Sequence, residues 1–306
     1  MVIASGDAAV CTMVAVHEPV FLITGASGYL GRRLVARATI RGRVHAATHR
    51  PAVAAERSAV TMEIGDRDAV LEIVERLKPT AVIHAAAVNP GQGDETEMMR
   101  VNADGSRFVA EAARAVDARL VAVSTDNVHD GRAGPYADDA PPTPINAYGR
   151  SKAAGEKAVF EVDASAVVVR TSLMYGLDEM DRGTAGFAER LARGEELSLF
   201  SDVLRNPVHV DVLADALVQL TEVDYSGLLN VAGRQALTRE EFGRTMLAYW
   251  GVEDDGLIQP VCAADISDTI PLDVRLVSNR GEMLLETIFP GVDDVLSTTP
   301  PTSHSD

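Results

Sequence analysis

A glycine-rich turn between an apolar run and an amphipathic run constrains this chain more than any other feature of its sequence. The apolar run, residues 20–24, has the composition of a buried strand, and residues 29–41 have the spacing of an amphipathic helix. Between them, Gly25, Gly28 and Gly31 follow the spacing GxxGxxG. Glycines at such a turn let the backbone approach a pyrophosphate at the N-terminus of the helix. We therefore predict a dinucleotide site here, with a merely tight turn as the alternative.

The rest of the first half of the chain alternates short apolar runs with longer amphipathic ones. This alternation is typical of β-α-β units around a parallel sheet. The predicted fold class is therefore α/β, a Rossmann-type doubly wound parallel sheet with a smaller C-terminal lobe. The predicted strands are residues 20–24, 43–48, 60–64, 81–87, 120–124 and 166–170, and the predicted helices are 29–41, 69–77, 98–116 and 148–160.

The pattern changes beyond residue 176, where helices at 185–193 and 211–221 accompany short strands at 197–200 and 228–231. We divide the chain into an N-terminal tail (1–18), a Rossmann domain (19–175), a second lobe (mainly 176–290) and a C-terminal tail (291–306). Met13 is an alternative start. No Ser/Gly linker marks the boundary at 176, so a strand such as 228–231 can rejoin the first sheet.

The charge balance excludes several classes of partner. Lys and Arg number 28 against 45 Asp and Glu, and the net charge of -17 argues against a nucleic-acid or acidic-membrane surface. An anionic ligand therefore needs a local basic pocket. No stretch approaches the roughly 18 apolar residues of a spanning helix, and residues 1–18 lack a basic start, so we expect a soluble cytoplasmic protein. Cys11 and Cys262 have no metal-ligand spacing, so no metal site is expected.

The end of the strand at 43–48 indicates which dinucleotide binds. An acidic residue there would hold the adenosine ribose of NAD, but residues 47–50 read Ala-Thr-His-Arg. Arg50, helped by Arg32, can instead pair with a 2′-phosphate, because a guanidinium matches phosphate oxygens geometrically. This favours NADP(H); the alternative is a solvated loop arginine. The glycine-turn residues expected to bind the cofactor are Gly25, Ser27, Gly28, Tyr29, Leu30 and Gly31.

Tyr148 and Lys152 form a YxxxK pair on one face of the helix predicted at 148–160. A phenol with a pKa of about 10 is a poor acid-base catalyst, and a neighbouring ammonium should lower that pKa. The lysine can also reach the ribose hydroxyls of a nicotinamide cofactor. Thr125 ends the fifth strand, where its hydroxyl can hydrogen-bond a substrate carbonyl. The alternatives are a surface Tyr/Lys pair and a capping role for residues 124–126.

Four segments together resemble the extended short-chain dehydrogenase/reductase superfamily, and within it the dTDP-4-dehydrorhamnose reductases. The resemblance covers about residues 19–220, and the segments occur in the order of that family. They are Lys-Pro-Thr-Ala-Val-Ile-His-Ala-Ala-Ala (78–87), Ser-Thr-Asp-Asn-Val-His-Asp-Gly (124–131), Tyr-Gly-Arg-Ser-Lys-Ala-Ala-Gly-Glu (148–156) and Arg-Thr-Ser-Leu-Met-Tyr-Gly (170–176).

The resemblance implies NADP(H) in the Rossmann domain, a nucleotide-diphosphate sugar in the C-terminal lobe, and a homodimer as a possible assembly. It assigns catalysis to Thr125, Tyr148 and Lys152. In the cofactor site it implies that Gly28, Tyr29 and Leu30 contact the pyrophosphate and that Asp66 and Arg67 contact the adenine. Ala85, Ala86 and Ala87 would contact the middle part of the cofactor molecule, and Tyr148 and Lys152 would also bind the cofactor. For the substrate we expect contacts from Val88, Asn127 and Arg205.

Two departures from the family keep other functions open. Asn127 and His129 stand where the family usually has aromatic residues, and residues 205–211 look closer to nucleotide-sugar epimerases. The first hypothesis is an NADPH-dependent reductase of a nucleotide-activated 4-keto-6-deoxy sugar. The alternatives are a nucleotide-sugar epimerase or dehydratase, and a non-catalytic NADP-binding regulatory subunit resembling the methionine adenosyltransferase β subunit.

Overall fold

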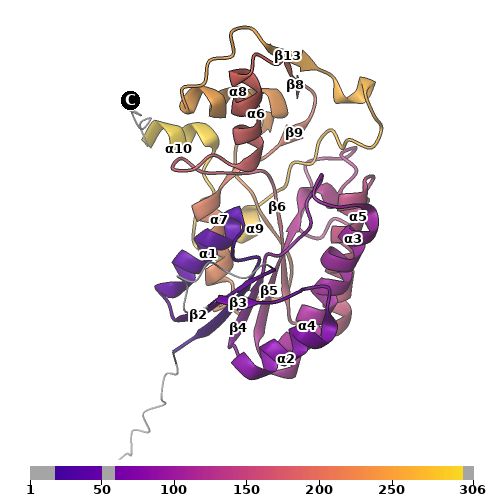
Figure 1. Cartoon of the computed structure of the whole chain (residues 1–306), viewed down its shortest axis with the longest axis vertical. Helices are drawn as coiled ribbons and strands as arrows, with labels where there is room; N and C mark the ends of the chain where they lie inside the picture. Colours follow the sequence, from indigo (N-terminus) through magenta and orange to yellow (C-terminus); the bar gives the residue numbers. More distant parts are fainter. Residues whose placement is uncertain (1–17, 50–58, 299–306) are drawn as a thin grey trace, which may run out of the picture.

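The protein is built on a seven-stranded parallel sheet with helices on both faces. The computed structural model describes residues 18–49 and 59–298. The strand order is β11-β6-β5-β4-β1-β2-β3, every neighbouring pair is parallel, and this confirms the predicted Rossmann-type fold class (Figure 1). The strands are β1 (Val20–Thr24), β2 (Arg43–Thr48), β3 (Ala59–Thr61), β4 (Ala81–His84), β5 (Arg119–Thr125), β6 (Val167–Thr171) and β11 (Gly227–Val231).

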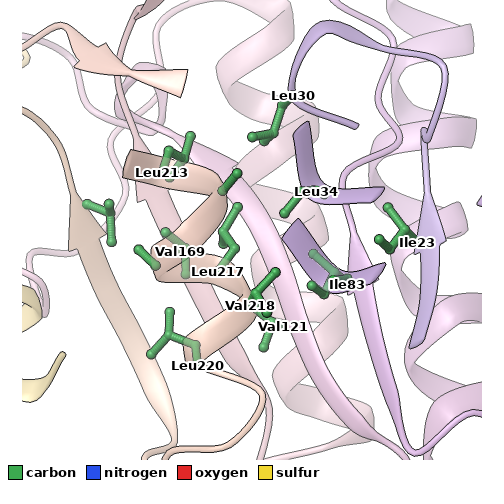
Figure 2. Close-up of a cluster of buried hydrophobic side chains, with 14 of the residues drawn as sticks. Ile23, Leu30, Leu34, Ile83, Val121, Val169, Leu213, Leu217, Val218 and Leu220 are labelled. Atoms are coloured by element: carbon green, nitrogen blue, oxygen red, sulfur yellow. The ribbon is translucent and has the colours of Figure 1, made fainter. Parts of the chain in front are cut away.

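The strands bury side chains on both faces because a helical layer covers each face. On β1, Leu22 packs into one apolar cluster while its neighbours Phe21 and Ile23 pack into the other. Figure 2 shows the second cluster, in which Leu34 of α1 and Leu217 of α7 meet the sheet. One layer contains α1 (Tyr29–Thr39) and α7 (Val210–Gln219), and the other contains α2 (Arg67–Leu77), α4 (Gly105–Ala115) and α5 (Ala147–Val162).

A smaller lobe lies beyond the carboxyl edge of the sheet, at the top of Figure 1. Its own apolar cluster joins Leu191, Leu197, Leu199, Leu247 and Ile258. Its main elements are α6 (Arg182–Ala192), β8 (Leu197–Phe200), β9 (Leu204–Arg205), β12 (Leu237–Thr238), α8 (Arg239–Tyr249), β13 (Ile258–Val261) and α10 (Val292–Thr298). The short remaining elements are α3 (Glu95–Met98), η1 (Met99–Asp104), η2 (Asp126–Val128), β7 (Met174–Tyr175), β10 (Val208–His209), η3 (Ala263–Asp265) and α9 (Asn279–Leu284).

The second half of the chain does not separate cleanly from the sheet. The strand expected at 228–231 pairs with β6 as β11, and α7 packs against α1, so both belong to the first unit. The expected C-terminal tail is corrected at residues 292–298, which form α10, because Val292 is fully buried in an apolar cluster. Among the helices of the described ranges, none is long and apolar enough to cross a membrane.

The helix expected at 98–116 is also different in detail. It begins earlier, at α3, where Asp94 accepts a hydrogen bond from the backbone of Glu97 at 2.8 Å, and it passes through the π-helical turn η1 before α4. Within that turn the side chain of Asn102 bonds both backbone groups of Val88 and the hydroxyl of Ser151. A π turn of this kind often marks a functional site.

The layered core predicts a large cost for removing one of its leucines. Leu217 is fully buried, whereas Ile40 is 79% exposed. We expect Leu217→Ala to lower the free energy of unfolding by about 2 to 5 kcal/mol, because it leaves a cavity between α7 and the sheet. Ile40→Ala should change it by no more than about 0.5 kcal/mol. Urea unfolding measures both, and equal effects would contradict this description of the core.

Candidate active site

The glycine turn brings two loops of the sheet edge into direct contact. Gly25 has a φ of +69°, and a Cβ there would lie 2.7 Å from the backbone nitrogen of Ala86, after β4. A Cβ on Gly31 would overlap the carbonyl oxygen of Gly25. Gly28 is the N-cap residue of α1, so no side chain there accepts a hydrogen bond from the first amides of the helix, and the first turn of α1 has no acidic residue. The N-terminal amides and the positive end of this helix are therefore available to a phosphate.

A cavity of about 440 Å³ begins at this turn, a size that suits a small-molecule ligand. It lies where the strand order reverses between β1 and β4, which is the ligand crevice of open α/β sheets. The structure brings most of the predicted site residues into its wall. They are Gly25, Ser27, Gly28, Tyr29, Leu30, Gly31, Ala85, Ala86, Ala87, Val88, Thr125, Tyr148 and Lys152.

Four predicted site residues within the described ranges do not line this cavity. Arg50 lies outside the described residues. Asp66 caps α2 and accepts from the backbone of Ala69 at 3.2 Å, while Arg67 donates to Glu111 at 2.7 Å. The adenine contacts expected of Asp66 and Arg67 therefore stay predictions. The other two, Asn127 and Arg205, form a polar cluster beside the cavity, described below.

The end of the cavity next to β2 and β3 holds polar groups that the sequence reasoning missed. Glu63 stands between His49, 2.8 Å from its Oε2, and Arg100, whose Nη1 donates to its Oε1 at 3.1 Å. The signal was hidden, because the strand predicted at 60–64 contains Glu63, whereas the observed β3 ends at Thr61 and leaves Glu63 at the carboxyl edge of the sheet. Arg32, expected to assist Arg50, instead pairs with Glu179 at 2.6 Å.

Helix α5 places Tyr148 and Lys152 at the opposite end of the cavity. Its first turn is fixed by Asn146, whose side chain accepts from the backbone of Gly149 at 2.8 Å. The Nζ of Lys152 is buried and donates to the carbonyl of Val123 at 2.8 Å. Burial lowers the pKa of Lys152 to about 8, although the nearby carboxylate of Glu156 opposes that shift. The ammonium is therefore still the major form at neutral pH.

The pKa of Tyr148 corrects the sequence-based expectation. We expected a neighbouring ammonium to lower it, but burial raises the pKa of Tyr148 to about 12, and the charge of Asp126 adds to this. A hydrogen bond with Thr125 and the charge of Arg205 oppose the rise. The phenol is consequently protonated at neutral pH, which is the form that donates a proton to an oxygen.

Behind Thr125, a buried carboxylate organises the remaining polar residues. Asp126 accepts from Arg205 at 2.7 Å and from Asn127 at 3.0 Å on one oxygen, and from Ser172 at 2.7 Å on the other. Asp126 is only 1% exposed, so its charge depends on these donors. Arg205 and Asn127 thus stand together beside the catalytic candidates, and their predicted contacts with substrate stay predictions.

The fold and this arrangement match a known family. The family described as the RmlD substrate binding domain matches residues 20–273. The chain belongs to this family. The expected resemblance to the dTDP-4-dehydrorhamnose reductases is thereby confirmed.

Three relatives of this RmlD-family chain illustrate its range. It is 34% identical over 250 residues to a dTDP-4-keto-6-deoxy-D-glucose reductase from Streptomyces niveus, covering 79% of this chain and 82% of that one. It is 30% identical over 241 residues to the methionine adenosyltransferase 2 subunit beta of Xenopus laevis, covering 74% and 70%. The crystal structure of a Bacillus anthracis dTDP-4-dehydrorhamnose reductase in complex with NADP superimposes with a TM-score of 0.78, 25% identity and coverage of 92% and 98%.

The contact between Gly31 and the turn predicts a selective loss of dinucleotide binding. Alanine is the better helix former, so Gly31→Ala gains propensity but forces the turn away from α1. We expect at least about a tenfold loss of NADPH affinity in a fluorescence titration, by analogy with losing one phosphate contact. Gly186→Ala, in α6, meets no atom within 4 Å and should bind NADPH as the parent does. Equal NADPH affinities in the two variants would contradict the assignment of the glycine turn as the dinucleotide site.

Proposed function

We propose that this protein is an NADPH-dependent reductase of a nucleotide-activated 4-keto-6-deoxy sugar. The observation that supports this most is the meeting of Thr125, Tyr148 and Lys152 in the wall of one cavity, at the end opposite β3, in a chain of the RmlD family. The named relatives that reduce dTDP-sugars support the same substrate class. The homodimer and the cytoplasmic location stay predictions from the sequence.

The residues of the cavity fit a dinucleotide. The space left by Gly25 and Gly31 and the uncapped start of α1 suit a pyrophosphate, while the buried ammonium of Lys152 suits the hydroxyls of a ribose. Bound NADPH would supply the hydride that reduces the carbonyl carbon. The preference for NADP(H) rests on Arg50 and on the sequence of residues 47–50, which has no carboxylate.

The side chains at the α5 end of the cavity have separate roles at the carbonyl oxygen of the substrate. Tyr148 holds its proton at neutral pH and donates it to the oxygen as negative charge develops there. Thr125 hydrogen-bonds both this tyrosine and the adjoining carboxylate of Asp126, so its hydroxyl is fixed where it orients the substrate. The positive charge of Lys152 stabilises the phenolate that remains after the proton has left.

A stoichiometric assay tests the proposed function. The parent protein is mixed with NADPH and with dTDP-, UDP- and GDP-linked 4-keto-6-deoxy sugars in turn. We expect NADPH absorbance to fall in step with product for at least one of them. Product without any loss of NADPH would favour the epimerase hypothesis. Tight NADPH binding with no turnover would favour the regulatory hypothesis, which the relative from Xenopus laevis keeps relevant.

The role of Tyr148 predicts a separate loss of turnover. Tyr148→Phe removes one hydroxyl and keeps the ring, so packing and NADPH affinity should be unchanged. We expect kcat to fall by about 10² to 10⁴-fold, the usual contribution of general acid catalysis. Tyr225→Phe is the matched control, because that hydroxyl bonds the carbonyl of Leu228 far from the cavity lining. Full activity in Tyr148→Phe would show that another group is the acid.

A further inference from the structure

The positive charge of Arg205 is already engaged within the protein. Its Nη1 pairs with Asp126 at 2.7 Å and its Nη2 lies 3.4 Å from the amide oxygen of Asn127, so the guanidinium is held at the end of β5. Arg205 as a whole is 8% exposed. Its Nε is buried and has no acceptor among the described residues. Arg205 is therefore best placed to position neighbouring groups and has one donor left over.

A second guanidinium, that of Arg239, lies next to this pair. Arg239 is the first residue of α8, directly after β12, and β12 pairs antiparallel with β9 so that Leu237 lies opposite Arg205. Its backbone nitrogen donates to the carbonyl of Val203 at 2.9 Å, which fixes the start of the helix beside β9. The charges of Arg205, Asp181 and Asp126 all act on its side chain.

The side chain of Arg239 has no acceptor of its own within the part of the chain that the structure describes: no hydrogen bond or ion pair joins it to another residue there. The two nearby carboxylates are engaged. Asp181 accepts from Gly183 and from Thr184 at the start of α6, and Asp126 accepts from the four donors around it, Arg205 included. Burial and the charge of Arg205 lower the pKa of Arg239 to about 10, so it remains charged at neutral pH.

We propose that Arg239 binds a phosphate of the nucleotide-diphosphate part of the substrate, beside the buried Nε of Arg205. A partly buried guanidinium without a partner is costly, and an anion with several oxygens removes that cost through paired hydrogen bonds. This inference rests on the proposed function, of which it specifies the substrate contact. In a protein of net charge -17, such a group also supplies the local basic pocket that an anionic substrate needs.

The position of Arg239 distinguishes a substrate phosphate from a cofactor phosphate. The glycine turn and α1 belong to the wall of the main cavity, and Arg239 does not line it. Arg239 stands in the second lobe, next to the Arg205–Asp126 pair whose charges reach Tyr148. A substrate whose carbonyl lies at Tyr148 can therefore extend its diphosphate toward α8, away from the cofactor.

Calorimetric titration with nucleoside diphosphates tests this assignment without requiring turnover. The protein is loaded with NADP⁺ and titrated with dTDP and UDP, each compared with its nucleoside. We expect Arg239→Gln to weaken binding of the preferred diphosphate by about ten- to a hundredfold, as for loss of one charge-assisted contact, and to leave nucleoside and NADPH affinity unchanged. Arg239→Lys should lose less diphosphate affinity than Arg239→Gln, because lysine keeps the positive charge but lacks the two parallel N–H donors of a guanidinium.

The matched control is Arg244→Gln, which removes the same charge from the same helix. Arg244 is paired with Glu240 and Asp254, so diphosphate affinity should match that of the parent. Unchanged diphosphate affinity in Arg239→Gln overturns the assignment while leaving the proposed reductase intact. A parent that binds dTDP or UDP through Arg239 but reduces no keto sugar supports the phosphate site and overturns the reductase. A parent that binds neither diphosphate overturns the phosphate site, whereas the stoichiometric assay decides the reductase.

Discussion

The buried ion pair between Glu156 and Arg170 is the interaction on which the site depends. Both oxygens of Glu156 accept from Arg170, at 3.0 and 2.7 Å, and Ser124 donates to the same carboxylate at 2.5 Å. Removing one partner of such a pair costs on the order of 3 to 5 kcal/mol, because the other charge is left buried. Glu156 follows Lys152 by four residues on α5, so the pair fixes the rotation of the helix that carries Lys152 and Tyr148.

The same arrangement explains how an acidic protein presents positive charge to an anionic ligand. Buried carboxylates lie underneath the site, with Glu156 near Lys152 and Asp126 near Arg205. Glu156 raises the pKa of Lys152, and Asp126 forms an ion pair with Arg205, so each carboxylate offsets the cost of burying a cation. The carboxylates are enclosed by their donors, whereas the cations stand toward the cavity and the second lobe. The net charge of -17 therefore does not describe the local field at the site.

Local patterns were sufficient for the parts of the fold that depend on local physics. The bounds of β1 and β2 and the glycine turn follow from runs of apolar residues and from backbone geometry, and Thr125 follows from its position at the end of a strand. Contacts between residues that are distant in the sequence could not be predicted from local patterns. Arg205 and Asp126 are 79 residues apart, and the burial that raises the pKa of Tyr148 depends on packing between α5 and segments that are distant in the sequence. A charge rule applied to YxxxK alone therefore gave the wrong direction.

The fate of the transferred hydrogen tests the central claim most directly. The parent protein is incubated with a 4-keto sugar nucleotide and NADPH that carries deuterium at both C4 positions, and the product is analysed by mass spectrometry and NMR. Hydride transfer from NADPH to the carbonyl carbon predicts a single deuterium at that carbon for each NADPH consumed. A rearranged sugar without deuterium, formed while NADPH stays constant, would contradict the account and indicate internal oxidation and re-reduction instead.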